Sequence, residues 1–142
     1  MKHCGRNGSH LFVLERGEKL ISTLTPALAE LEIQGGILSG LGALKDVELG
    51  FYELDHKEYI RKTLSEDHEL ISLSGNVALK DGKPFIHVHA ALGDAQFRVF
   101  GGHLFEAVVA VTVEVSLTPY AFSPVREPNA DIGLALICKF SD

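Results

Sequence analysis

A single helical pattern followed by strand patterns is the feature that most constrains the fold of this chain. From Glu18 to Ile33 the apolar residues recur at the i, i+4 and i+7 spacing of an amphipathic helix. Pro26 lies inside this window and has no amide hydrogen, so we expect it to kink the helix or to begin its second half. Gly35-Gly36 then favours the end of the helix.

Most of the remaining chain has the alternation of apolar and polar residues that is typical of strands. We expect strands over residues 11–15, 37–44, 47–54, 59–64, 69–79, 84–92, 96–100, 106–117 and 134–140. Lys45-Asp46 is expected to form a turn or a bulge between two of them, and Asp81-Gly82 a hairpin turn. Pro119 to Asn129 contains three prolines and is expected to be a loop. This order of elements predicts an α+β fold with a mostly antiparallel sheet.

Length and charge narrow the class of protein. The chain has 142 residues, enough for one domain, and we place an N-terminal segment at residues 1–8 and the domain at residues 9–142. Its net charge of −6 repels phosphate backbones, and its Lys and Arg residues form no cluster. We therefore expect the isolated chain to bind DNA weakly or not at all. No apolar run is long enough for a transmembrane helix, so no membrane partner is expected.

The two cysteines, Cys4 and Cys138, lie at opposite ends of the chain and lack the spacing of a zinc site. The N-terminal residues contain no apolar region of the kind found in secretory signals. We therefore expect a cytoplasmic protein with reduced thiols. Cys138 lies in an apolar stretch and is expected to be a small core residue.

His87-x-His89 is the strongest candidate for chemistry. Residues i and i+2 of a strand point to the same face, so the two imidazoles are predicted to lie side by side. His103 follows Gly101-Gly102, and this glycine pair lets the backbone turn tightly and present the next side chain at a strand edge. Three histidines that leave a fourth position open are typical of catalytic zinc sites. The alternative is that these histidines are exposed or are satisfied within the core.

Glu106 lies three residues after His103 and is a candidate for orienting a ligand or moving a proton. A carboxylate that simply faces solvent is the alternative reading of the same residue. The other histidines have neighbours that indicate loops or a chain terminus, and we expect them at the surface: His3, His10, His56 and His68.

Three motifs in order, ISLSG, HxH and GGHL, carry a resemblance to a known family. They lie in the segments ELISLSGNVAL, IHVHAALGD and FRVFGGHLFEAVVAVTVEV, and the earlier segment GILSGLGALKDVELGFYE is also similar. The chain resembles the plants and prokaryotes conserved (PPC) domain over about Leu11 to Phe140. Each motif alone is common, whereas their order is specific.

The resemblance implies an α+β fold in which an antiparallel sheet is flanked by helices and three copies form a trimer. Plant members of the family bind AT-rich DNA through attached AT-hooks, which this chain lacks. Prokaryotic members carry histidines that match His87, His89 and His103. They resemble the acetolactate decarboxylases, which hold zinc through three histidines. A trimer also suits the strand at residues 106–117, whose second face carries Val108 and Ala110 beside polar residues.

Two hypotheses follow. In the first, the chain binds Zn²⁺ or another divalent metal through His87, His89 and His103 and acts on a small molecule. In the second, it is a non-catalytic trimeric module whose association with DNA is weak or indirect.

Overall fold

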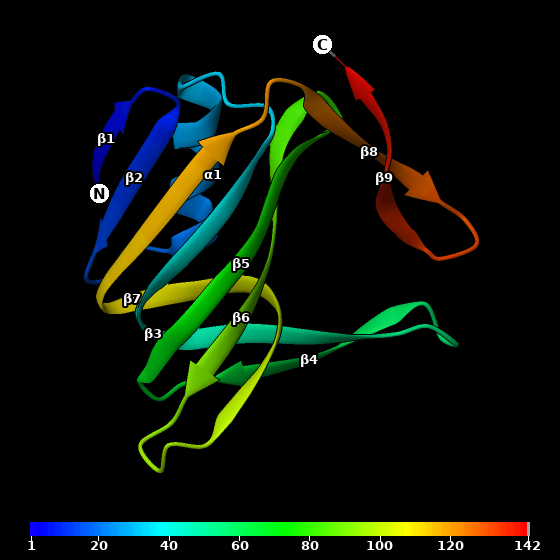
Figure 1. Ribbon diagram of the computed structural model, residues 1–142. Helices are drawn as coiled ribbons and strands as arrows, with labels where there is room; N and C mark the ends of the chain where they lie inside the picture. Colours follow the sequence, from blue (N-terminus) through cyan, green and yellow to red (C-terminus); the bar gives the residue numbers. More distant parts are fainter. Residues whose placement is uncertain (142) are drawn as a thin grey trace.

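The computed structural model describes residues 1–141 as nine strands and one helix (Figure 1). The elements are β1 (Lys2–Arg6), β2 (Ser9–Glu15), α1 (Leu20–Glu30), β3 (Gly36–Glu53), β4 (Glu58–Leu64), β5 (His68–Lys80), β6 (Lys83–Gly93), β7 (Val99–Pro119), β8 (Ser123–Asn129) and β9 (Leu134–Ser141). All named strand pairs are antiparallel except β5 with β8. The predicted α+β class is confirmed, but the expectation of several flanking helices is wrong, because only α1 occurs within these residues.

Four strands pair in a closed ring. β3 pairs with β5 and β7, and β6 pairs with the same two strands from the other side. The hairpin of β1 and β2 extends the sheet along β7, whereas β4 pairs with the second half of β3. The hairpins β3–β4 and β8–β9 project to the same side of this body (Figure 1).

Helix α1 covers one face of the sheet and closes the core. Its buried residues Leu20, Leu24 and Leu28 follow the predicted helical spacing and pack against β6 and β7. The helix is shorter than the predicted window and continues through Pro26. Pro26 is exposed, as is Ser22, whose carbonyl would otherwise accept the missing hydrogen bond. Water can therefore satisfy that carbonyl, and the helix tolerates the proline.

Two long strands replace four predicted ones. The bulge expected at Lys45-Asp46 is confirmed, with Asp46 at a φ of 47°, and β3 continues through it as one strand. β7 likewise runs without a break from Val99 to Pro119. Where β3 advances by two residues, β7 advances by four. This irregularity buries Ala110, which was expected on the partly polar face, and leaves Val111 67% exposed.

The hairpin turn at Asp81-Gly82 is confirmed, and both residues have the positive φ that such turns require. The loop predicted from Pro119 to Asn129 is wrong, since β8 occupies residues 123–129. Both Pro124 and Pro128 lie in this strand, which is paired along its length only with β9. Prolines are tolerated there because an edge strand leaves some amide positions unpaired.

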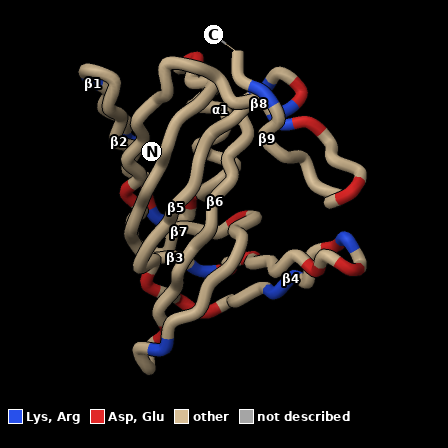
Figure 2. Tube along the Cα trace, turned by 45° about the vertical axis from the view of Figure 1, so that its right-hand side comes forward, with Lys and Arg blue, Asp and Glu red and all other residues tan. Residues whose placement is uncertain are grey.

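The surface shows no concentration of positive charge over residues 1–141. Lys and Arg residues are interspersed with acidic residues on the loops and on the two projecting hairpins (Figure 2). Cys138 is exposed on β9 rather than buried, because β9 pairs only with β8 and lies outside the core. The described residues include no helix of the length and hydropathy needed to cross a membrane.

Candidate metal centre

His87, His89 and His103 meet on the outer face of the sheet, opposite the core. His87 and His89 project from β6, while the alternate residues Ile86 and Val88 are buried. The register of β6 and β7 places His103 directly opposite His89. Backbone pairing therefore brings together the three histidines that the sequence singled out.

Glycines allow the strands that carry the histidines to approach closely. A Cβ atom at Gly75 of β5 would lie 2.0 Å from the carbonyl oxygen of His87. A Cβ atom at Gly101 of β7 would lie 2.2 Å from the carbonyl oxygen of Ala90. Both positions are next to a histidine strand, and a side chain at either one would push that strand away.

The three imidazoles are close enough to share one ion. One nitrogen from each ring lies within 4.8 Å of the others, and the ring centres are 5.2 to 5.6 Å apart. A tetrahedral zinc ion with bonds of about 2.0–2.1 Å holds its ligand atoms about 3.3 Å apart. Binding of an ion would therefore draw the three ligand atoms closer together. His89 is exposed, so the site is open to solvent on one side.

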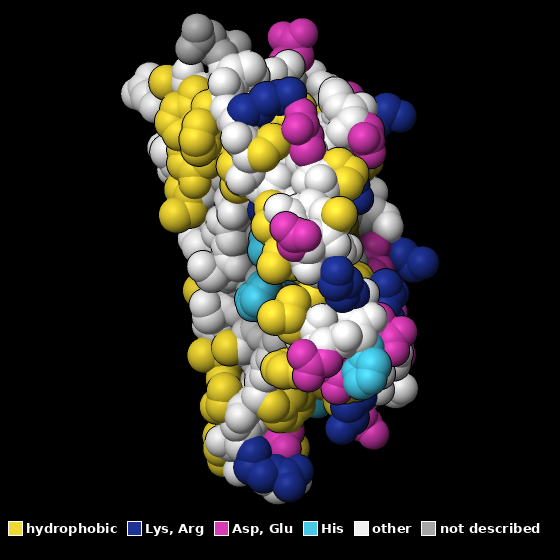
Figure 3. Space-filling view, turned by 90° about the vertical axis from the view of Figure 1, so that its right-hand side faces the viewer, with side chains coloured by type: hydrophobic (Ala, Val, Ile, Leu, Met, Phe, Trp, Pro, Cys, Tyr) yellow, Lys and Arg dark blue, Asp and Glu magenta, His cyan; other side chains and the backbone are white. Residues whose placement is uncertain are grey.

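Aromatic side chains and one arginine surround the histidines. Tyr59 of β4 and Phe105 of β7 pack on the ring of His103, at centre distances of 5.1 and 4.6 Å. Arg126 of β8 lies against His87, with Nη2 3.1 Å from Nδ1. Figure 3 shows histidine side chains in a hollow of this side of the molecule. The centre thus takes residues from β4, β6, β7 and β8.

The environment keeps two of the histidines neutral. Burial, followed by the positive charge of Arg126, lowers the pKa of His87 from 6.5 to about 4. Burial also lowers the pKa of His103, with a further contribution from His89. Each of the two rings therefore has one unprotonated nitrogen at neutral pH, as metal ligation requires.

An unpaired nitrogen supports the fit of a metal. Nδ1 of His103 is buried and has no hydrogen-bond partner among residues 1–141. A buried polar atom without a partner costs free energy of about 1–3 kcal/mol, and such atoms are rare in folded proteins. Three imidazoles, two of them held neutral, form the donor set that zinc and similar borderline ions prefer.

Glu106 does not join this centre. It lies on the opposite face of β7 from His103 and Phe105, and its carboxylate accepts hydrogen bonds from the amides of Ile21 and Ser22 at 2.9 and 3.1 Å. These amides belong to the first turn of α1, which has no side-chain cap of its own. Glu106 therefore caps the helix, and the role predicted for it at the metal has no support in this geometry.

The remaining histidines lie away from the centre. His56 is exposed at the tip of the β3–β4 hairpin and bonded to Glu53, as predicted. His3 and His10 stack on each other on the β1–β2 hairpin. The expectation for His68 is wrong, since only 7% of it is exposed. It packs edge-to-face on Phe100 and is bonded through Nδ1 to a backbone carbonyl.

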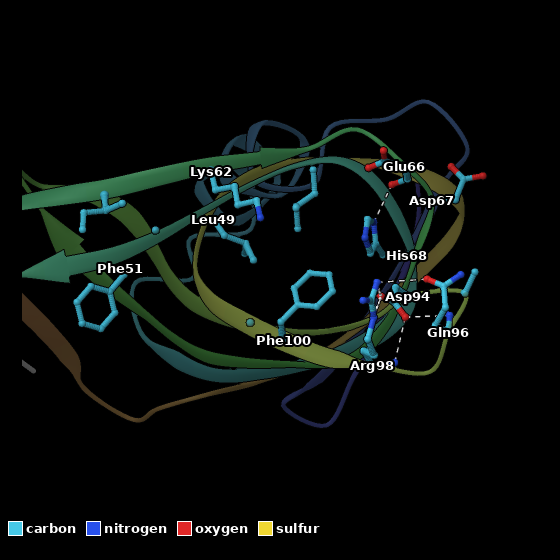
Figure 4. A pocket seen from close by; sticks show the side chains of 15 residues that line it. Leu49, Phe51, Lys62, Glu66, Asp67, His68, Asp94, Gln96, Arg98 and Phe100 are labelled. Atoms are coloured by element: carbon cyan, nitrogen blue, oxygen red, sulfur yellow. Dashed lines mark hydrogen bonds and ion pairs between the residues drawn. The ribbon is translucent and has the colours of Figure 1, made fainter.

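A second cavity of about 860 Å³ lies on the reverse face of β4. Tyr59 and Arg61 face the histidines, whereas Ile60 and Lys62 line this cavity. Its walls are largely apolar, and charged residues gather at the end where His68 lies (Figure 4). The cavity is therefore distinct from the metal centre.

Arg126 is the member of the centre that the sequence did not reveal. It lies in the proline-rich segment that was predicted to be a loop, and no motif surrounds it. The only available signal was a lone arginine between Val125 and Glu127. Its position follows from two parallel pairs between β5 and β8, Leu79 with Val125 and Lys80 with Arg126.

Comparison with known proteins identifies related chains. Residues 1–121 match the family model of the Plants and Prokaryotes Conserved (PCC) domain. A protein from Synechococcus sp. (strain JA-3-3Ab) named bifunctional protein GlmU is 33% identical over 122 residues. That match covers 82% of this chain but only 18% of the relative, so this chain spans about a fifth of the length of that protein.

Several solved structures share the fold. A metal-containing protein from Archaeoglobus fulgidus is 38% identical, with a TM-score of 0.87 over 92% of this chain and 93% of its own. A plant- and prokaryote-conserved protein from Pyrococcus horikoshii is 37% identical, with a TM-score of 0.86 over 97% and 95%. A protein from Ralstonia eutropha JMP134, named as a candidate DNA-binding protein, is 26% identical, with a TM-score of 0.86 over 95% and 94%.

A more distant structure tests the predicted fold. Acetolactate decarboxylase from Bacillus subtilis is 14% identical, with a TM-score of 0.53 over 91% of this chain and 60% of that chain. This likeness concerns the fold alone. At that level, the expected resemblance to the acetolactate decarboxylases is confirmed.

Proposed function

This chain belongs to the Plants and Prokaryotes Conserved domain family, and we propose that it binds a divalent metal ion, Zn²⁺ in the first instance, and acts on a small molecule there. The ligands in this proposal are His87, His89 and His103. The observation that carries it is the convergence of three imidazoles, one of which, His103, has a buried ring nitrogen without a hydrogen-bond partner among residues 1–141. The metal-containing relative from Archaeoglobus fulgidus supports the same view.

In this proposal the metal ion activates the bound ligand, and the protein side chains position it. A zinc ion bound by three histidines polarises an oxygen of its ligand and lowers the pKa of a bound water towards neutrality. The exposed side at His89 leaves room for a ligand to enter. Tyr59 and Phe105 form the aromatic wall that fixes the ring of His103. Glu106 has no part in this scheme.

Metal titration of untagged protein tests the proposal. We expect about one Zn²⁺ per chain by isothermal titration calorimetry, and at least a 100-fold loss of affinity in His87→Ala, His89→Ala and His103→Ala. His56→Ala removes an exposed histidine of the β3–β4 hairpin and serves as the matched control, with unchanged affinity. If the wild-type protein took up no zinc, cobalt, nickel or manganese, the metal function would be wrong. The non-catalytic module would then be the better description.

We also propose that the chain forms a homotrimer. Support comes from the sheet face opposite α1, where Ile37, Leu41 and Ile71 are each more than half exposed. The register places Leu41 of β3 beside the irregular pairing at residues 70–72 of β5. Apolar residues exposed together on a sheet are typical of a subunit interface. Light scattering at micromolar concentration is expected to give three times the chain mass, and a monomer mass would contradict the proposal.

DNA is not the ligand in this proposal. The net charge of −6 and the interspersed charges of the described residues leave few phosphate contacts (Figure 2). We expect no sub-micromolar binding of duplex DNA at physiological salt, and a tight complex with a steep salt dependence would be evidence against this. The two free cysteines, Cys4 and Cys138, agree with the cytoplasmic location that we propose.

A further inference from the structure

Arg126 is a buried cation without a carboxylate partner. It is 9% exposed, and no acidic side chain of residues 1–141 lies within ion-pair distance of it. Arg61 and Arg98, by contrast, pair with Glu48 and Asp94. Burying a charge without a counter-ion costs several kcal/mol, so a buried unpaired arginine requires an explanation.

The guanidinium makes three hydrogen bonds to neutral groups. Nη1 donates to the carbonyl of Ala135, and Nη2 donates to Oδ1 of Asn76 and to Nδ1 of His87, each at 3.1 Å. Nε is buried and has no hydrogen-bond partner within the described part of the chain. These contacts hold Arg126 in place against β5 and β6, with one donor unused beside the metal centre.

The bond to His87 is incompatible with a metal on that histidine. A neutral imidazole has one lone pair, because its other nitrogen carries the proton. Since an arginine can only donate, Nδ1 of His87 accepts with that lone pair, and Nε2 is then protonated. Ligation through Nδ1 would replace the bond, and ligation through Nε2 would move the proton to Nδ1. In either case Nη2 of Arg126 loses this acceptor.

The metal-loaded centre would therefore combine a divalent ion with a guanidinium that has two free donors, Nε and one hydrogen of Nη2, while Nη2 keeps its bond to Asn76. Nε and Nη2 lie on the same edge of the guanidinium and point in parallel, the arrangement that pairs with a carboxylate through two hydrogen bonds. Two cations at close range repel each other, and an anion between them removes that repulsion. One carboxylate would both accept hydrogen bonds from the guanidinium and reduce its repulsion with the metal ion.

We propose that Arg126 binds the carboxylate of a small-molecule ligand whose other end reaches the metal, which makes the ligand of this centre a small organic acid. This inference rests on the proposed metal function and names its substrate class. Arg126 lies beyond the residues 1–121 that match the family model.

Side-chain NMR of ¹⁵N-labelled, zinc-loaded protein tests the proposal. Glycolate is the probe, because it carries a carboxylate next to a hydroxyl that can approach the ion. Titration is expected to shift the Nε–H resonance of Arg126 in a saturable way. Arg126→Met is expected to weaken glycolate binding at least 10-fold without weakening zinc binding. Arg126→Lys, which keeps the charge but not the fork, should show an intermediate loss. Arg98→Met removes an arginine that already has a carboxylate partner and is expected to change neither affinity.

The outcomes separate this proposal from the metal function. Zinc binding is read first, from the imidazole resonances in the absence of glycolate, and its failure would overturn both proposals. If zinc binds but the Arg126 resonance stays fixed, or Arg126→Met and Arg126→Lys both bind glycolate like the wild type, only the carboxylate proposal is overturned. Inorganic phosphate is the second probe. A response to phosphate without one to glycolate would overturn the choice of a carboxylate.

Discussion

Replacing Glu106 distinguishes a structural carboxylate from a catalytic one. Its Oε1 accepts hydrogen bonds from the amides of Ile21 and Ala107, and its Oε2 accepts from the amide and the hydroxyl of Ser22. Loss of a helix cap costs about 0.5–2 kcal/mol. Loss of a negative charge near a helix N-terminus adds about 0.3–1 kcal/mol. Because the amide of Ile21 is only partly reached by water, we expect Glu106→Ala to lower the free energy of unfolding by about 2–3 kcal/mol.

Urea unfolding of the zinc-free protein at fixed concentration measures this change. Glu106→Gln keeps one acceptor oxygen but loses the charge, and we expect it to cost about 1 kcal/mol. Glu58→Ala is the matched control, since Glu58 is an exposed strand carboxylate for which no side-chain hydrogen bond occurs in residues 1–141. It should remain within about 0.5 kcal/mol of the wild type. Zinc affinity is expected to stay unchanged in all three variants. Unchanged stability together with weakened zinc binding in Glu106→Ala would refute the reasoning.

Three further predictions concern the packing and charge of the same body. His68→Ala should lower the free energy of unfolding by about 1–3 kcal/mol, because it removes a buried side chain together with its hydrogen bond to the carbonyl of Glu66 and its packing on Phe100; a change below about 0.5 kcal/mol in urea unfolding would contradict this. Gly75→Ala should destabilise the chain and weaken zinc binding at least 10-fold in calorimetry, because its Cβ would meet the backbone of His87 at 2.0 Å. Gly82→Ala is the control: a Cβ there has nothing within 4 Å, and zinc binding should be unchanged. The pKa of His87 is lowered to about 4 in the folded protein, so on acidification its imidazole is protonated first in the unfolded chain. The zinc-free protein should therefore lose up to about 2–3 kcal/mol of stability as the pH falls from 6.5 towards 4. His87→Gln should show a correspondingly smaller loss in the same urea titrations.

Local patterns predicted the elements that depend on local physics. The hairpin at Asp81-Gly82 follows from residues that accept a positive φ, and helix α1 follows from the spacing of Leu20, Leu24 and Leu28. The pair His87 and His89 follows from the two-residue period of a strand. In each case, the information lies within a few residues of chain.

Features that depend on distant pairing were not predicted. The exchange of Ala110 and Val111 between the faces of β7 arises from an irregular register with β3, which no local alternation records. Glu106 is three residues from His103 in sequence, but the period of the strand sends it to the other face, where α1 requires a cap. β8 was missed because its prolines suggested a loop, although an edge strand tolerates them.

The metal ligands and Arg126 are held by parts of the fold that differ in how firmly they are attached. His87, His89 and His103 lie on strands that belong to the closed ring. Strand pairing on both sides fixes His89 and His103 before any ion arrives, and pairing with β5 fixes His87 on one side. Arg126 lies on the β8–β9 hairpin, which joins the sheet through two parallel pairs with β5. A segment with few hydrogen bonds to the rest of the sheet unfolds locally at a lower free energy than a strand of the closed ring. The rigid part of the centre thus supplies the metal ligands, whereas the part that we propose to recognise the carboxylate can adjust to its ligand. Binding of the acid is therefore expected to be coupled to the order of this hairpin, through Asn76 and Ala135, which hold the guanidinium from either side.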